Sequence, residues 1–288
     1  MKRLILLFTI LLFSCSTDEL AFVEEIQEAQ VVQDVKPEPE AEPEATSEET
    51  VEETPEATPE TQEPEQYELV EGLTQEEVQG IKDAIDAAEW PALWHKKENG
   101  QTIIPYYFRA EKSYDFDAEQ QESIREAFAE FSAQTNIEFR EYPNEDALQE
   151  FSYQGVSVFP AFMYGSTHRG MKGGIQNFKV PKEAEKKVIL GMAAILAGLE
   201  NEDQRPDAYD YITIHWENIY ESAFPVFEPV EGYISSGMFD FYSITRSHPK
   251  AFSKNGEYTV TLQNGVPLTP RNELSIIDIL RINYLYAD

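Results

Sequence analysis

Apolar positions at regular spacing begin only near Leu73 and predict a folded domain over residues 73–288. Alternating or continuous apolar runs predict strands, which we place at residues 101–108, 137–139, 156–159 and 175–180. A three-to-four-residue spacing predicts helices that begin after Thr74, Asp117 and Ser275, because each is a residue type that caps helix N-termini. Strands and helices followed by a mostly helical and irregular C-terminal half indicate an α+β domain with a mixed sheet.

One further helix is predicted from Lys187 to Leu199. Its residues are apolar nearly all round, a pattern typical of a deeply buried helix. Gly198 marks its end, since glycine commonly stands where a helix terminates.

The segment before the domain, residues 15–72, has a different composition. Residues 16–72 hold twenty acidic residues and one lysine, and from Glu24 to Glu71 large apolar residues are almost lacking. Such a self-repelling segment cannot bury enough surface to fold. We therefore predict a disordered acidic linker rich in Pro, Glu and Thr, which acts as a spacer. An acidic recognition tail is the alternative.

Residues 1–14 have the pattern of a lipoprotein signal peptide. Lys2 and Arg3 precede an apolar run from Leu4 to Phe13, which is too short to span a bilayer as a stable helix. The tract from Leu12 to Cys15 resembles a bacterial lipobox, which implies that Cys15 becomes the lipidated first residue. We expect an exported protein anchored in membrane lipid, at the outer membrane or cell surface if the cell is Gram-negative. An ordinary secretory signal is the alternative.

The charge and cysteine content exclude several classes of function. The formal net charge is −32, so a basic surface for phosphates is not expected, and nucleic acid is not a predicted partner. Cys15 is the only cysteine, which excludes a disulfide framework and thiol catalysis in the domain.

Six tracts stand out along the domain: Ile104-Pro105-Tyr106, 170–176, 205–219, 239–243, 251–256 and 274–286. The most specific of them is Asp210-Tyr211-Ile212-Thr213-Ile214-His215-Trp216-Glu217-Asn218-Ile219. In their order and spacing they resemble the astacin family of zinc metallopeptidases, from about Trp94 to Leu285. The resemblance implies a zincin-like metallopeptidase fold.

The family's zinc motif is H-E-x-x-H-x-x-G-x-x-H, in which three imidazoles hold the metal and Glu activates its water. When Gly198 is matched to the motif's glycine, the three ligand positions fall on Gly191, Ile195 and Asn201. The general-base position then falls on Met192. The family's Met-turn pattern S-x-M-H-Y falls on residues 243–247, which places Thr245 and Ser247 where the family has Met and Tyr. We therefore expect no metal, no other cofactor and no catalysis of the family's kind.

Other chemistry is weighed against this interpretation. The histidines have no i, i+4 pair, and they are His95, His168, His215 and His248. His215 is interpreted as structural, whereas His168 and His248 are candidates to meet across the family's cleft. Two alternatives are a Ser–His–Asp set that uses Ser166 or Ser247, and a calcium site formed by Glu200, Glu202 and Asp203.

The predicted function is that of a non-catalytic, astacin-like lipoprotein, a pseudoenzyme that binds extended peptide or protein at the cell envelope. The resemblance places that peptide along an edge strand, here formed by Gly174, Ile175, Gln176, Asn177 and Phe178, where strand addition needs no metal. Two alternatives are an active zinc metalloendopeptidase with unrecognised ligands, and a structural envelope lipoprotein whose cleft has filled in.

Overall fold

The computed structural model describes residues 72–110, 114–162, 164–230, 237–269 and 271–287. All of them belong to one unit, which extends from Val70 to Asp288. The predicted signal peptide, Cys15 and the linker up to Glu71 lie outside the described residues. Within the described part of the chain, no helix is long and apolar enough to cross a membrane.

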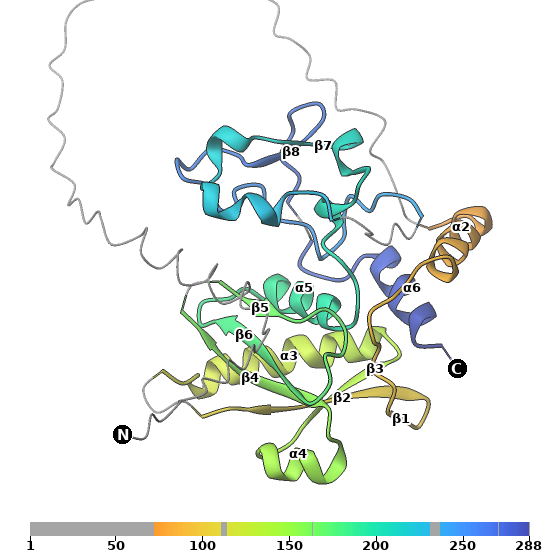
Figure 1. Cartoon of the computed structure of the whole chain (residues 1–288), viewed down its shortest axis with the longest axis vertical. Coiled ribbons are helices and arrows are strands. Elements are labelled where there is room, and N and C mark those ends of the chain that lie inside the picture. Colours follow the sequence, from red (N-terminus) through yellow and green to blue (C-terminus); the bar gives the residue numbers. More distant parts are fainter. Residues whose placement is uncertain (1–71, 111–113, 163, 231–236, 270, 288) are drawn as a thin grey trace, which may run out of the picture. The chain divides into compact units, whose positions relative to one another are not determined.

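A mixed sheet organises the first half of this unit (Figure 1). Its strands are β1 (Lys97–Glu98), β2 (Gln101–Phe108), β3 (Ile137–Glu141), β4 (Gly155–Ala161), β5 (Ser166–Thr167) and β6 (Ile175–Pro181). The order is β1-β2-β4-β6-β5, and β3 also pairs with β2. Strands β2, β3, β4 and β6 are parallel, whereas β1 and β5 are antiparallel to their neighbours. The four predicted strands and the mixed sheet are confirmed.

Within the described residues, five helices accompany the sheet: α2 (Gln75–Asp86), α3 (Ala118–Gln134), α4 (Glu145–Phe151), α5 (Lys186–Leu196) and α6 (Ile276–Leu285). Helices α3 and α5 cover one face of the sheet and α4 lies on the other (Figure 1). The predicted N-caps Thr74, Asp117 and Ser275 each form a capping box, in which the cap and the third helical residue bond reciprocally.

Most residues of helix α5 are buried. Ile189, Leu190 and Ala193 are at most 1% exposed and pack into the main core with α3 and the sheet. On its other side, however, Val188 is 38% exposed. The prediction of a deeply buried helix is therefore confirmed for most of its residues, and Val188 is the exposed exception. The helix also ends at Leu196, before the predicted Leu199, and Gly198 then adopts a positive φ of 108°.

The C-terminal half is irregular, as predicted. Its described residues hold the two-stranded sheet of β7 (Ile212–Ile214) and β8 (Val260–Leu262). They also hold four short 3-10 segments, which are Glu202–Gln204, Ala208–Asp210, Trp216–Asn218 and Glu221–Val226. Aromatic contacts stabilise this half, as between Tyr211 and Phe239, whose ring centroids lie 4.7 Å apart. The α+β class with an irregular second half is confirmed.

The prediction that Gly174–Phe178 forms the sheet edge is wrong at Phe178, whereas Ile175–Asn177 pair with β4 and not with β5. Strand β6 lies between β4 and β5, and Phe178 pairs with Val158 on one side and Thr167 on the other. Gln176 is only 3% exposed, and its side chain bonds the backbone of the preceding turn. Among the described strands, β5 ends the sheet instead. Its two residues are too few for an alternating pattern to show in the sequence.

Candidate functional site

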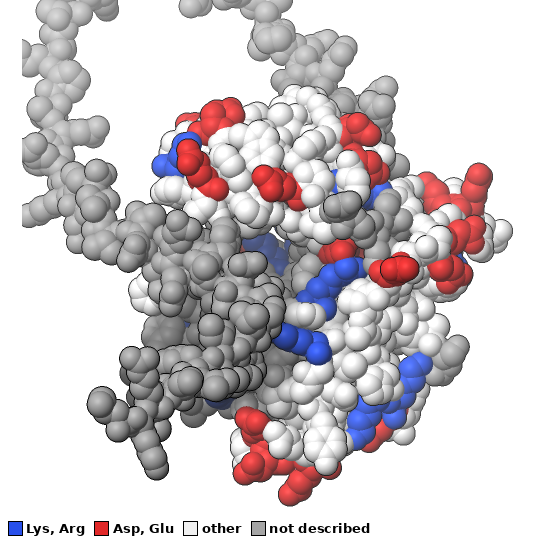
Figure 2. All heavy atoms as spheres, in the orientation of Figure 1, with Lys and Arg blue, Asp and Glu red and all other residues white. Residues whose placement is uncertain are grey.

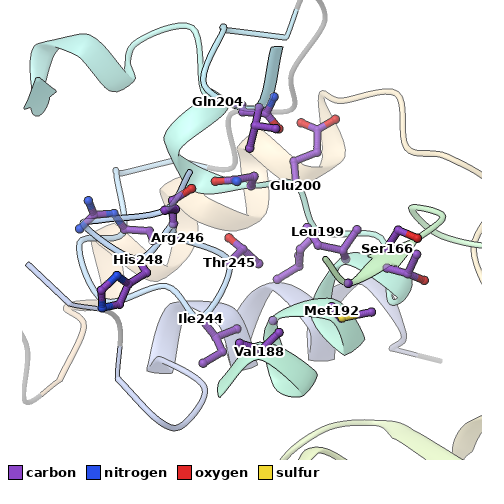
Figure 3. A pocket seen from close by; sticks show the side chains of 18 of the residues that line it. Ser166, Val188, Met192, Leu199, Glu200, Gln204, Ile244, Thr245, Arg246 and His248 are labelled. Carbon is purple, nitrogen blue, oxygen red and sulfur yellow. The ribbon is translucent and has the colours of Figure 1, made fainter. Parts of the chain in front are cut away.

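A cleft of about 750 Å³ separates the sheet half from the C-terminal half, and its walls come from segments far apart in the sequence. Helix α5 forms the floor, β5 lies along one side, and the segments 199–204 and 244–252 complete the walls. Figure 3 shows Val188 and Met192 on α5, with Ile244 and Thr245 beside them. Arg246 and His248 lie at one end of this view, far from Ser166 at the other.

One stripe of α5 faces the cleft along the length of the helix. Its members are spaced by one, three, one and three positions, which places them on a single helical face, and they are Lys187, Val188, Gly191, Met192 and Ile195. This stripe contains two of the three positions matched to zinc ligands and the position matched to the general base. Asn201, matched to the third ligand, also lines the cleft. All four matched positions therefore meet in this cleft.

Gly191 has no room for a side chain. A Cβ added there would lie 2.8 Å from the backbone oxygen of Ile244. That segment is held firmly, because the Ile244 N–H donates to the buried carboxylate of Asp278 at 2.8 Å. The chain that crosses the cleft wall therefore packs directly against the helix at the first ligand position.

Met192 occupies the space between α5 and the end of the sheet. A Cβ added at Gly165, just before β5, would lie 2.5 Å from Met192 Sδ. The thioether thus packs against the backbone of the chain entering β5, with only 9% of Met192 exposed. This arrangement makes the centre of the floor apolar.

Polar side chains beneath the cleft wall form a buried network around Thr245. Thr245 Oγ1 accepts from the Glu202 N–H at 3.2 Å and lies 2.8 Å from Ser243 Oγ. Ser243 Oγ donates in turn to Asp278 Oδ1 at 2.8 Å. The segment that carries Thr245 is therefore tied both to α6 and to the residues after α5, so the cleft wall is rigid.

The carboxylates that follow α5 are each bound by arginine. Glu202 accepts from Arg205 at 3.0 Å and from Arg281 at 2.9 Å, and Asp203 accepts from Arg246 at 2.8 Å. Glu200 pairs with Arg169. Because these carboxylates already bind arginine, their oxygens are not available to a calcium ion. The predicted alternative of a calcium site at Glu200, Glu202 and Asp203 is therefore wrong.

Burial and neighbouring charge act in opposite directions on the pKa values of this network. Burial disfavours ionised Glu202, but Arg281 and Arg205 outweigh it and hold the pKa of Glu202 below its ordinary value. Asp240 differs: burial, followed by the charges of Asp278 and Glu202, raises its pKa to about 7. Burial also raises the pKa of Asp278.

The histidines do not assemble into a catalytic group. His215 Nε2 lies 3.0 Å from Thr261 Oγ1 on β8, in agreement with a structural role. His248 lines the cleft, whereas His168 is not among its lining residues.

A Ser–His–Asp set is not formed either. The Lys250 N–H donates to His248 Nδ1 at 3.1 Å, where a triad would need that nitrogen to donate to a carboxylate. Burial, then the charge of Lys187, lowers the pKa of His248. Throughout the described residues, no group of three or more His, Cys, Asp or Glu side chains is placed to hold a metal ion.

A comparison with models of protein families assigns this chain to a known family. The model of the Astacin family of peptidases matches residues 92–287, which is most of the described unit. The chain belongs to the astacin family. Sequence reasoning thus recognised the family, although it missed Lys187 and Gly165 as residues of this astacin-like site. A signal for Lys187 was available, because it stands four positions before Gly191 on the same helical face.

Known relatives agree with this assignment. The Low choriolytic enzyme of Oryzias latipes is 30% identical over 209 residues, covering 70% of each chain. The Embryonic protein UVS.2 of Xenopus laevis is 28% identical over 71% of this chain, which spans only 38% of that protein's length.

A solved structure supports the fold. High choriolytic enzyme 1 of Oryzias latipes, a hatching enzyme zinc-protease, is 28% identical and superposes with a TM-score of 0.58. The match covers 68% of this chain and 94% of that chain. The zincin-like fold of this chain is therefore established.

Proposed function

We propose that this protein is a metal-free member of the astacin family that binds extended peptide in its cleft. The observation that carries the proposal is that Gly191, Met192, Ile195 and Asn201 all line one cleft. These positions, matched to the family's zinc ligands and general base, face the same space but supply no imidazole, thiolate or carboxylate.

Zinc does not fit these residues. Zinc sites in proteins use Cys, His and acidic ligands, and glycine and isoleucine have no donor atom in their side chains. Asn201 offers one amide oxygen, and that oxygen already accepts from the Asp203 N–H at 3.0 Å. Without a metal and a general base, water activation of the family's kind has no chemical basis here.

Retention of the cleft supports binding over a purely structural role. A cleft of about 750 Å³ is of the size that ligand sites usually have. Strand β5 ends the described sheet beside it, so an extended peptide could add to β5 and gain main-chain hydrogen bonds. This position for the bound peptide, along β5, replaces the predicted position along β6.

For the chain as a whole, we propose a lipoprotein displayed at the cell envelope. Residues 1–14 would be the signal peptide, Cys15 the lipidated residue, 15–72 a spacer and 73–288 the binding domain. Two basic residues, Lys2 and Arg3, and the lipid pattern at the N-terminus support export, and the strong acidity of the chain argues against nucleic acid as a partner.

Metal content tests the proposal directly. Purified protein should contain far less than one zinc per chain by elemental analysis. A chelator should leave its melting temperature unchanged, because no metal contributes to the folded state. An astacin with an intact motif, treated in parallel, is the control and should lose zinc.

Peptide binding tests the second claim, that the cleft binds extended peptide. A library of extended peptides should contain members that bind without being cleaved. Stoichiometric zinc together with chelator-sensitive cleavage would show an active enzyme. A protein that binds no peptide at all would instead favour the structural role.

A further inference from the structure

The cleft floor is apolar where a zinc peptidase would hold its metal. Val188, Met192 and Ile195 face the cleft from α5, and Ile244 faces it from the opposite wall. Met192 and Ile244 are mostly buried, so Val188 and Ile195 present most of this concave apolar surface to a ligand, and such surfaces usually bury an apolar group of a partner. The floor therefore suits an apolar side chain and not a polar one.

The lining of the cleft is less acidic than the chain as a whole. Among the described lining residues, Arg169, Lys187 and Arg246 are cationic and Glu200 alone is acidic, whereas the whole chain carries −32. Figure 2 shows basic side chains in the central hollow of this face and most acidic side chains on the parts around it. Each of these three cations already pairs with a carboxylate, so a ligand carboxylate would bind here by replacing one of those partners.

Lys187 is the lining cation best placed to exchange partners. Arg246 is buried and bound to Asp203, and Arg169 is bound to Glu200. Lys187 pairs at 2.9 Å with Glu185, whose side chain is 68% exposed. Ion pairs with exposed partners contribute little to stability, so a ligand carboxylate could replace Glu185 at small cost.

A buried hydroxyl favours a peptide over an acyl chain. Thr167 Oγ1, on the cleft side of β5, is buried, and within the described part of the chain it has no hydrogen-bond partner. An unsatisfied buried hydroxyl is costly, and a backbone amide of a peptide would satisfy it whereas a hydrocarbon chain would not.

The helix sets the spacing between the apolar and the charged contact. Lys187 and Ile195 are separated by two turns of α5, or about 12 Å along its axis. An extended peptide advances about 3.3 Å per residue, so that distance corresponds to about three or four residues.

We infer that the cleft selects peptide segments that combine an apolar side chain, seated on Met192 and Ile195, with a carboxylate bound by Lys187 about three or four residues away. This inference rests on the proposed function, because it names the class of peptide that the metal-free cleft takes.

Matched peptides and matched variants test it on the full chain. Fluorescent peptides with Leu and Asp at that spacing should bind at least about tenfold more tightly than versions with Ser for Leu or Asn for Asp. Lys187→Gln should remove the preference for Asp over Asn. Lys186→Gln is the control, because Lys186 pairs with Glu130 of α3 and does not line the cleft.

The binding results distinguish failure of this inference from failure of the proposed function. Peptides that bind without either preference, or equal behaviour of Lys187→Gln and Lys186→Gln, would overturn the inference and leave the proposed function standing. If no peptide binds, the proposed function and the inference fail together. Oleate binding in the absence of any peptide binding would assign the cleft to acyl chains and also overturn the inference.

Discussion

At the scale of single residues, close packing explains why position 191 is occupied by glycine. The backbone oxygen of Ile244 lies where a Cβ would be, and Asp278 holds that segment in place. The absence of a side chain at Gly191 and the close packing of the cleft wall are thus the same structural feature. A larger residue would fit at this position only if the wall moved.

We predict that Gly191→Ala lowers the free energy of unfolding by about 1–3 kcal/mol, because overpacking exceeds the gain in helix propensity. Gly80→Ala is the matched control, since an added Cβ there meets no atom within 4 Å inside α2. The control should be stabilised by up to about 1 kcal/mol. Urea denaturation measures both, and stabilisation of both variants would contradict the packing argument.

The buried carboxyl of Asp240 should make stability depend on pH. Its pKa is raised to about 7, from an ordinary value near 4 in the unfolded chain. The folded state therefore binds more protons between these values, and its stability falls as pH rises from about 4 to about 7. Thermal melts over this range should show a smaller slope for Asp240→Asn.

Asp207 provides the opposite control. Its hydrogen bonds from Arg205 hold its pKa below the ordinary value, so its contribution is lost as pH falls. Asp207→Asn should thus reduce stability at neutral pH and much less in acid. An Asp240→Asn slope identical to that of the wild type would show that another group dominates.

At the scale of elements, two capping boxes of the same type lie in different environments. Thr74 caps α2 in an exposed position, where Thr74 Oγ1 accepts from the Glu77 N–H at 3.2 Å. Ser275 caps α6 in a buried position, where Ser275 Oγ accepts from the Asp278 N–H at 2.9 Å and also donates to Asp240. Because Ser275 is buried, its cap should contribute more to the free energy of unfolding than the cap at Thr74.

We predict that Thr74→Ala costs about 0.5–1 kcal/mol, an ordinary loss for an N-cap. Ser275→Ala should cost about 2 kcal/mol or more, because it leaves buried polar groups without partners. Chemical denaturation of the two single variants gives the comparison. Equal losses would mean that water replaces the Ser275 hydroxyl.

At the scale of the whole molecule, the proposed anchor is open to a direct test. Cys15→Ser should shift the protein from the membrane fraction to the soluble fraction, because the acyl chains that hold it at the bilayer would no longer be attached. Ser47→Ala in the acidic segment is the control and should stay with the membrane. Membrane partitioning that is the same for Cys15→Ser and wild type would contradict lipidation.

Local pattern was sufficient for much of the fold. The N-caps Thr74, Asp117 and Ser275 were predictable because capping depends on a few neighbouring residues. The four main strands were predictable from their apolar runs. The two-residue strand β5 and the β7–β8 pair were not, because such short elements exist only through their partners.

The sequence by itself determined the family, the fold class and the identity of the residues matched to the zinc site. These depend on residue types at given spacings, which are visible in one dimension. Only the tertiary structure decided that α5 has an open side, that β5 ends the sheet in place of β6, and that the arginines neutralise the carboxylates after α5. The physical reason is that edges, clefts and buried ion pairs form between segments far apart in the chain, where packing and desolvation outweigh local propensity.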